Sequence, residues 1–156
     1  MSVLSYLEGR ASQAVLQQTE KDSIERSIKT LRARLDSNLG EKISEQIQFG
    51  SSTRGTILPR RMDSESDIDY MVRFNDSQYT PQTYLNWLKR FALSSYSKSE
   101  VLQSNPVIVL ELNHIKFELV PAVLIGGVLK ITSLPTSLQT KRSGGPCESV
   151  HRRQFA

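Results

Sequence analysis

The chain has 156 residues, of which 38% are hydrophobic and 23% charged, and its formal net charge is +4. These values are typical of one globular domain with its own core. No run of about 18 apolar residues occurs, so no membrane-spanning helix is expected. The N-terminus lacks the pattern of a secretory signal. The single cysteine, Cys147, excludes an intrachain disulfide and favours a reducing, cytoplasmic location.

Most of the positive charge lies at the C-terminal end. Residues 141–156 hold four of the 20 basic side chains and one of the 16 acidic ones, so the remaining 140 residues carry 16 basic and 15 acidic groups. A surface that binds duplex nucleic acid needs Lys and Arg clustered on the folded body. The charge distribution therefore argues against a nucleic-acid partner.

The first 40 residues show helical periodicity. Apolar residues recur every three or four positions over 3–18 and again over 21–39. Gly40 is suited to end the second helix. The sequence predicts two helices that pack their apolar faces against the domain.

Shorter elements are expected after residue 40, and they indicate an α/β (α+β) fold with a short mixed sheet flanked by helices. Alternating polar and apolar residues predict a strand over 67–74, with Asp67 and Asp69 on one face and Ile68 on the other. The other expected elements are a strand over 43–49, a helix over 81–98, a β-hairpin over 107–112 and 115–120, and an apolar segment that ends near residue 132.

Asp67 and Asp69 are the first candidates for chemistry. Two residues apart in a strand, they lie about 6.6 Å apart at the backbone, and both carboxylates can reach a common cation. Oxygen ligands of this kind suit Mg²⁺, which takes the rest of its shell from water and substrate phosphates. Alternatively, the pair is solvated at the entrance of a strand and helps to cap a turn.

A small-residue loop precedes this strand. Gly50, Ser51 and Ser52 can bind phosphate through backbone N–H groups and a hydroxyl, although an ordinary turn has the same composition. Three arginines follow and can pair with a triphosphate or simply be solvated: Arg54, Arg60 and Arg61.

Glu118 is the third acidic candidate. It lies in an apolar stretch closed by Pro121, where an unpaired charge is costly. If its strand lies beside the strand of Asp67 and Asp69, three carboxylates converge. Glu118 is then placed to ligate a metal and to act as general base on an attacking hydroxyl.

The other candidates indicate no second site. His114, His151 and Cys147 share no ligand spacing, which argues against zinc. Trp87 fits the apolar face of its helix better than a base-stacking platform.

The order of Gly50–Ser51, Asp67–Ile68–Asp69 and the acid in FELVPA resembles the DNA polymerase β-like nucleotidyltransferases. The strings GSSTRGT, SDIDYMV and FELVPA are most similar to the bacterial cGAS/DncV-like (CD-NTase, SMODS) cyclic-oligonucleotide synthases of anti-phage defence. These are relatives of animal cyclic GMP–AMP synthase and oligoadenylate synthase. The likeness covers residues from about 20 to 125.

The resemblance implies a catalytic domain over residues 1–132 and an irregular basic tail over 133–156, where the family continues into a helical second lobe. It implies two Mg²⁺ ions, replaceable by Mn²⁺, on Asp67, Asp69 and Glu118. Nucleotide binding is implied for Gly50, Ser51, Ser52 and Arg54.

The implied reaction is attack of a ribose hydroxyl on the α-phosphate of a nucleoside triphosphate, ATP or GTP or both, with release of pyrophosphate. Repeated steps close a cyclic di- or oligonucleotide. The resemblance also implies a regulatory or effector protein from the same defence system as a partner, and no membrane.

Two features depart from the family pattern. The third acid is commonly aspartate and is here Glu118, and residues 133–156 lack the pattern of a second lobe. Two alternatives therefore stay open. One is a one-lobe transferase that modifies a protein or small-molecule acceptor, as in toxin–antitoxin pairs, and the other is a nucleotide-binding module without catalysis.

Overall fold

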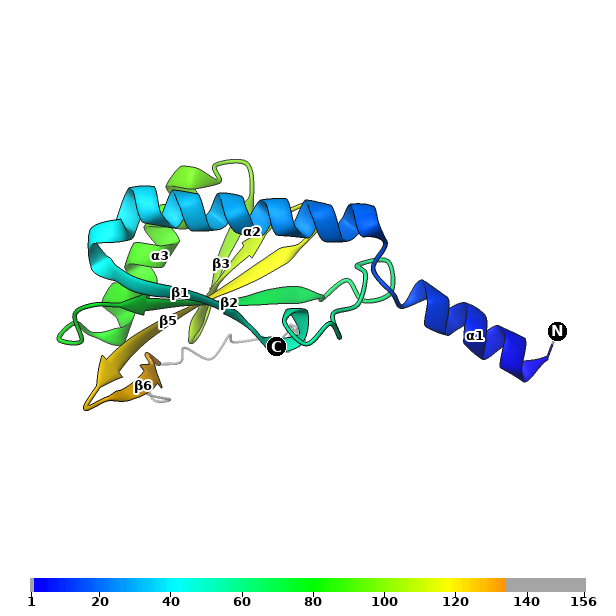
Figure 1. The fold of residues 1–156 in the computed structure, drawn as a ribbon. Helices are drawn as coiled ribbons and strands as arrows, with labels where there is room; N and C mark the ends of the chain where they lie inside the picture. The colour runs from blue at the N-terminus through cyan, green and yellow to red at the C-terminus, as the bar shows by residue number, and fades with distance from the viewer. Residues whose placement is uncertain (1, 134–156) are drawn as a thin grey trace, which may run out of the picture.

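The computed structural model describes residues 2–133, in which helices cover one face of a mixed, six-stranded sheet (Figure 1). The helices are α1 (Val3–Gln13), α2 (Gln18–Leu39) and α3 (Pro81–Ser95). The strands are β1 (Ile43–Phe49), β2 (Asp67–Phe74), β3 (Glu100–Ser104), β4 (Val107–Glu111), β5 (Lys116–Ile125) and β6 (Val128–Ile131). The predicted α/β class is confirmed. The expectations for Cys147, His151 and the basic tail lie outside the described residues.

The order of the strands is β1-β2-β5-β4-β3, and β6 pairs with the end of β5. β2 and β5 are parallel, whereas β1 with β2, β3 with β4, and β4 with β5 are antiparallel. In the parallel pair both strands begin at the same edge of the sheet. The first residues of β2 and β5 therefore lie side by side.

The alternation of β2 decides which face of the sheet is buried. Ile68, Tyr70 and Val72 are fully buried and belong to one core with side chains of α2 and α3. Full burial of such a side chain stabilises the fold by roughly 1.5–3 kcal/mol. Because neighbouring residues of a strand point to opposite faces, Asp67 and Asp69 lie on the face away from this core.

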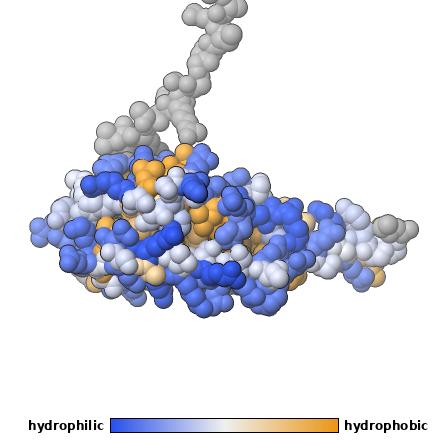
Figure 2. Space-filling view, turned by 90° about the horizontal axis from the view of Figure 1, so that it is seen from above, coloured by the Kyte–Doolittle hydropathy of each residue, from blue (hydrophilic) through white to orange (hydrophobic). Residues whose placement is uncertain are grey.

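The packing predicted for the first helix is wrong. No residue of α1 is buried, and Leu4 and Leu7 are 66% and 55% exposed. Both figures show α1 extending beyond the body of the molecule (Figures 1 and 2). Arg61 holds the C-terminal end of α1, because its guanidinium group donates hydrogen bonds to the carbonyls of Gln13 and Val15.

Several boundaries differ from those predicted. α1 ends at Gln13 instead of near residue 18, and α3 ends at Ser95 instead of near residue 98. β3 is absent from the prediction, and the last apolar segment is a hairpin that turns at Gly126–Gly127, both with positive φ. Among residues 2–133, no helix is both long and apolar enough to cross a membrane.

Candidate active site

Four charged side chains stand at the start of the central parallel strands. In the register of β2 and β5, Asp67 is opposite Lys116, and Asp69 is opposite Glu118. Register partners on paired strands point to the same face of a sheet. The strand of Glu118 thus lies beside the strand of Asp67 and Asp69, which was the condition for the three carboxylates to converge. They lie together on the face that α2 and α3 leave uncovered.

The environment of Glu118 and Asp69 opposes the ionisation of these two carboxyl groups. Burial raises the pKa of Glu118, the charges of Asp67 and Asp69 raise it further, and Lys116 partly offsets this effect. Burial also raises the pKa of Asp69, with a further increase from Asp67 and a decrease from Arg54. Closely spaced, partly buried carboxylates repel one another, so a bound cation would stabilise this cluster of acidic side chains.

The loop after β1 closes directly onto Asp69. Gly50 has φ of 76°, and a Cβ atom at this position would lie 1.9 Å from Asp69 Oδ2. Only glycine combines this backbone conformation with so close an approach. The chain therefore places bare backbone beside a site carboxylate.

The two serines of the loop have different surroundings. The Ser52 hydroxyl donates to the Phe49 carbonyl at 3.1 Å and accepts from Gln48 Nε2 at 3.0 Å. The Ser51 carbonyl accepts from the backbone N–H of Thr56 at 3.1 Å. Ser52 thus holds the loop in shape through its side chain, whereas Ser51 is held through its backbone.

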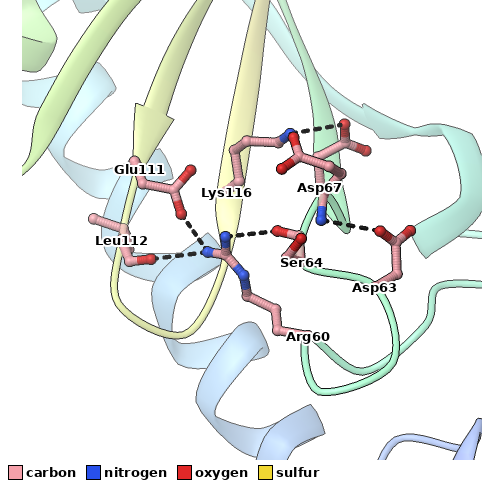
Figure 3. Close-up of polar contacts among 8 residues, drawn as sticks. Arg60, Asp63, Ser64, Asp67, Glu111, Leu112 and Lys116 are labelled. Carbon is pink, nitrogen blue, oxygen red and sulfur yellow. Dashed lines mark hydrogen bonds and ion pairs between the residues drawn. The ribbon is translucent and has the colours of Figure 1, made fainter.

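The three arginines predicted to reach a triphosphate differ in their contacts. Arg54 lies near enough to Asp69 to lower the pKa of that carboxyl. Arg60 instead pairs with Glu111 and donates to the carbonyls of Leu112 at 3.2 Å and Ser64 at 2.7 Å (Figure 3).

Arg61 pairs with Glu20 and holds the linker between α1 and α2. The expectation of triphosphate contacts is therefore not supported for Arg60 and Arg61. Their guanidinium groups are engaged in tying the segment between β1 and β2 to neighbouring elements.

Lys116 is the site residue that sequence reasoning missed. Its amino group donates to Glu65 Oε2 at 3.0 Å and lies 3.9 Å from Asp67 Oδ2, and its side chain is only 11% exposed. The signal was present in the strand alternation, which puts Lys116 and Glu118 on one face. A lysine is usually solvated, so alternation alone gave no reason to include it.

The carboxylates fit a hard divalent cation by their chemistry. No group of three or more His, Cys, Asp or Glu side chains among residues 2–133 is already arranged around one metal position. However, Asp67, Asp69 and Glu118 supply only oxygen ligands, which is the donor set that Mg²⁺ prefers. The Asp69 carboxylate occupies the position that a side chain on residue 50 would need, so the glycine lets this ligand lie against the loop.

Other features lie away from this face. A cavity of about 460 Å³ behind the loop is lined largely by apolar residues, among them Ile24, Ile57 and Ile68, on the core side of the sheet. The prediction for Trp87 is confirmed, because its ring packs against Phe74 and other aromatic rings of the core. Neither feature extends the carboxylate site.

Comparison with known proteins identifies the class to which this site belongs. The chain matches the family model for the Second Messenger Oligonucleotide or Dinucleotide Synthetase (SMODS) domain over residues 1–137. The chain therefore belongs to this family of nucleotidyltransferases. A comparison with curated protein sequences gives no match.

Solved structures agree in fold. CdnG of Bradyrhizobium diazoefficiens, a CD-NTase in complex with GTP, has a TM-score of 0.63 at 16% identity, covering 78% of this chain and 41% of CdnG. CdnC of E. coli MS115-1, in complex with HORMA-deltaN, has a TM-score of 0.58 at 19% identity, with 79% and 44% covered.

CdnE of Rhodothermus marinus, a c-UMP-AMP synthase, has a TM-score of 0.51 at 19% identity, with 72% and 43% covered. At these identities the likeness establishes the polymerase β-like fold. The chain spans less than half the length of each of these three relatives.

Proposed function

We propose that this chain carries the catalytic lobe of a metal-dependent nucleotidyltransferase that joins nucleoside triphosphates into a cyclic di- or oligonucleotide second messenger. The observation that supports it most is the convergence of Asp67, Asp69 and Glu118 on one sheet face, beside the bare backbone of Gly50. Membership of the SMODS family supports the same class of reaction.

In this proposal each residue has a role set by its position. Asp67 and Asp69 hold Mg²⁺, for which Mn²⁺ can substitute, and Glu118 completes the acidic group. Two bound ions would supply charge to activate the attacking hydroxyl and to stabilise the pyrophosphate that leaves. Gly50 and Ser51 contact the triphosphate through backbone N–H groups and a hydroxyl, Ser52 supports the loop, and Arg54 adds positive charge.

The reaction forms one bond and breaks another at the α-phosphorus. The oxygen of a ribose hydroxyl bonds to phosphorus, and the bond to the oxygen that bridges the α- and β-phosphates breaks. Glu118 accepts the proton of the hydroxyl as general base. Pyrophosphate leaves with the electron pair of the broken bond.

Substrate and partner assignments rest on the relatives. CdnG is seen with GTP, which supports GTP as a substrate here, with ATP as the second candidate. CdnC is seen with a HORMA protein, which supports a regulatory protein as partner. We assign the chain to anti-phage defence in the cytoplasm, with residues 1–132 as catalytic domain.

The experiment is a turnover assay with the four nucleoside triphosphates, each labelled at the α-phosphate, with Mg²⁺ or Mn²⁺. A small labelled product that resists phosphatase, and is absent with Asp67→Asn, is the predicted result. Label on a co-purified protein would instead identify a transferase to a protein acceptor. Binding of triphosphate with no pyrophosphate release under any of these conditions would contradict catalysis.

A further inference from the structure

Lys116 lies among carboxylates and has little access to solvent. Its side chain is 11% exposed, whereas that of its partner Glu65 is 81% exposed. Figure 3 shows Lys116 reaching across from β5 toward Asp67, while Arg60 turns to Glu111 on the next strand. The ammonium group of Lys116 on β5 is thus a cation next to the acidic site, 3.9 Å from Asp67 Oδ2.

The ammonium group of Lys116 has acidic side chains on several sides. It donates to Glu65 Oε2 at 3.0 Å and lies 3.9 Å from Asp67 Oδ2, and Glu118 lies two residues further along β5 on the same face. The other acidic neighbour, Glu111, is the register partner of Lys116 on β4, and it is already paired with Arg60. Lys116 therefore brings one fixed positive charge to Asp67 and Glu118.

A purely structural role accounts poorly for this placement. An ion pair with the exposed Glu65 contributes about 0–1 kcal/mol and does not require a lysine that is largely shielded from solvent. Burying an ammonium group costs free energy that only close carboxylates offset. The site that gains from the charge is the one formed by Asp67 and Glu118, where mutual repulsion needs a cation.

We propose that Lys116 is an intrinsic cation of the active site that competes with a free divalent ion for Asp67 and Glu118. This inference rests on the proposed function, since it concerns the same carboxylates. A divalent ion that arrives alone is repelled by Lys116. An ion that arrives with a triphosphate brings negative charge that offsets this repulsion, so Lys116 couples metal binding to nucleotide binding.

The test measures binding of Mn²⁺ by electron paramagnetic resonance, with and without non-hydrolysable ATP and GTP analogues. Lys116→Met keeps an unbranched side chain, one atom shorter than that of lysine, and removes its charge, whereas Lys116→Arg keeps the charge. Lys130→Met, on the exposed strand β6, is the matched control. Lys116→Gln provides a second neutral variant, and circular dichroism checks that each variant is folded.

Without nucleotide, we expect both neutral variants to bind Mn²⁺ about tenfold more tightly than the wild type. The reason is the loss of a repelling positive charge that lies 3.9 Å from Asp67 Oδ2. Lys116→Arg and Lys130→Met should stay within about threefold of the wild type. With an analogue bound, the difference in Mn²⁺ affinity between the neutral variants and the wild type should become smaller.

Equal Mn²⁺ affinity in the wild type and both neutral variants, with binding lost in Asp67→Asn, would overturn the role of Lys116 alone. No Mn²⁺ binding in any variant, even with an analogue, would overturn the proposed function as well.

Discussion

Asp69 on β2 and Glu118 on β5 are direct register partners in the parallel strand pair at the centre of the sheet. Both pKa values are raised, first by burial and then by neighbouring acidic groups. The fold thus brings together two carboxyl groups that destabilise each other when ionised. Such an arrangement gains from a bound cation, which supports a functional reason for it.

Replacing either aspartate should abolish turnover without unfolding the protein. Asp67→Asn and Asp69→Asn keep the shape of the side chain and remove the charge that would hold the metal. We expect turnover to fall by about a hundredfold or more. Asp22→Asn, on the exposed surface of α2, is the matched control and should retain wild-type turnover. Near-normal activity in both site variants would contradict the assignment.

Gly50→Ala should impair the active site both by straining the backbone and by displacing the Asp69 carboxylate. The new Cβ atom would lie 1.9 Å from Asp69 Oδ2, so the carboxylate must move. Gly55→Ala is an apt control, because Gly55 also has positive φ, 70°, with nothing within 4 Å of its Cβ position.

Both glycine variants should lose about 1–2 kcal/mol of stability from backbone strain, as measured by chemical denaturation. Only Gly50→Ala should also lose turnover and Mn²⁺ binding. Equal loss of turnover in the two variants would show that contact with Asp69 is unimportant.

Glu118→Gln should stabilise the metal-free protein at neutral pH although it impairs catalysis. The pKa of Glu118 is higher in the folded protein than in the unfolded chain. At pH values below the unfolded pKa this carboxyl group is protonated and contributes fully to the stability of the fold. That contribution is lost as the pH rises through the folded pKa. Above the folded pKa the ionised carboxylate is destabilised by burial and by its acidic neighbours, and a neutral glutamine avoids this destabilisation.

We expect the melting temperature of Glu118→Gln to exceed that of the wild type by about 2–4 °C at pH 7.5 with chelator present. The difference should vanish as pH falls through the folded pKa. Glu8→Gln, on the exposed helix α1, should show neither effect. A lower melting temperature for Glu118→Gln would mean that its charge stabilises the fold.

Arg61→Ala should loosen the linker between α1 and α2. The guanidinium group holds the carbonyls of Gln13 and Val15, each at 3.1 Å, and pairs with Glu20. Limited proteolysis should cut residues 14–17 faster, while the melting temperature of the domain changes little, because α1 buries no residue. Arg26→Ala on the outer surface of α2 should leave the cleavage rate unchanged.

Elements with strong periodicity could be predicted from the sequence. β2 was predicted with correct bounds because its alternation separates fully buried Ile68 and Tyr70 from Asp67 and Asp69. β3 was missed because EVLQS is a short edge strand whose residues are all at least partly exposed, so burial left little pattern in it. Periodicity also predicted α1 as a helix, but it carries no information about what covers the helix.

The site could be predicted in part for a related reason. Asp67, Asp69 and Glu118 were found because charge is unusual in apolar strands. The sequence could not say which partner a long basic side chain reaches. Arg60 and Arg61 have the same charge as Arg54 but contact neighbouring elements, and the side chain of Lys116 is only 11% exposed at the site instead of being solvated. Strand register and loop path decide these contacts, and both depend on the complete fold.

The most direct test of the metal site is anomalous diffraction from crystals grown with Mn²⁺ and a non-hydrolysable GTP analogue. Our account predicts Mn²⁺ peaks at the carboxylates of Asp67, Asp69 and Glu118, with the triphosphate against the backbone of Gly50 and Ser51. Data collected from Asp67→Asn under the same conditions should lack these peaks. A triphosphate bound elsewhere, or Mn²⁺ held without these three carboxylates, would contradict the account.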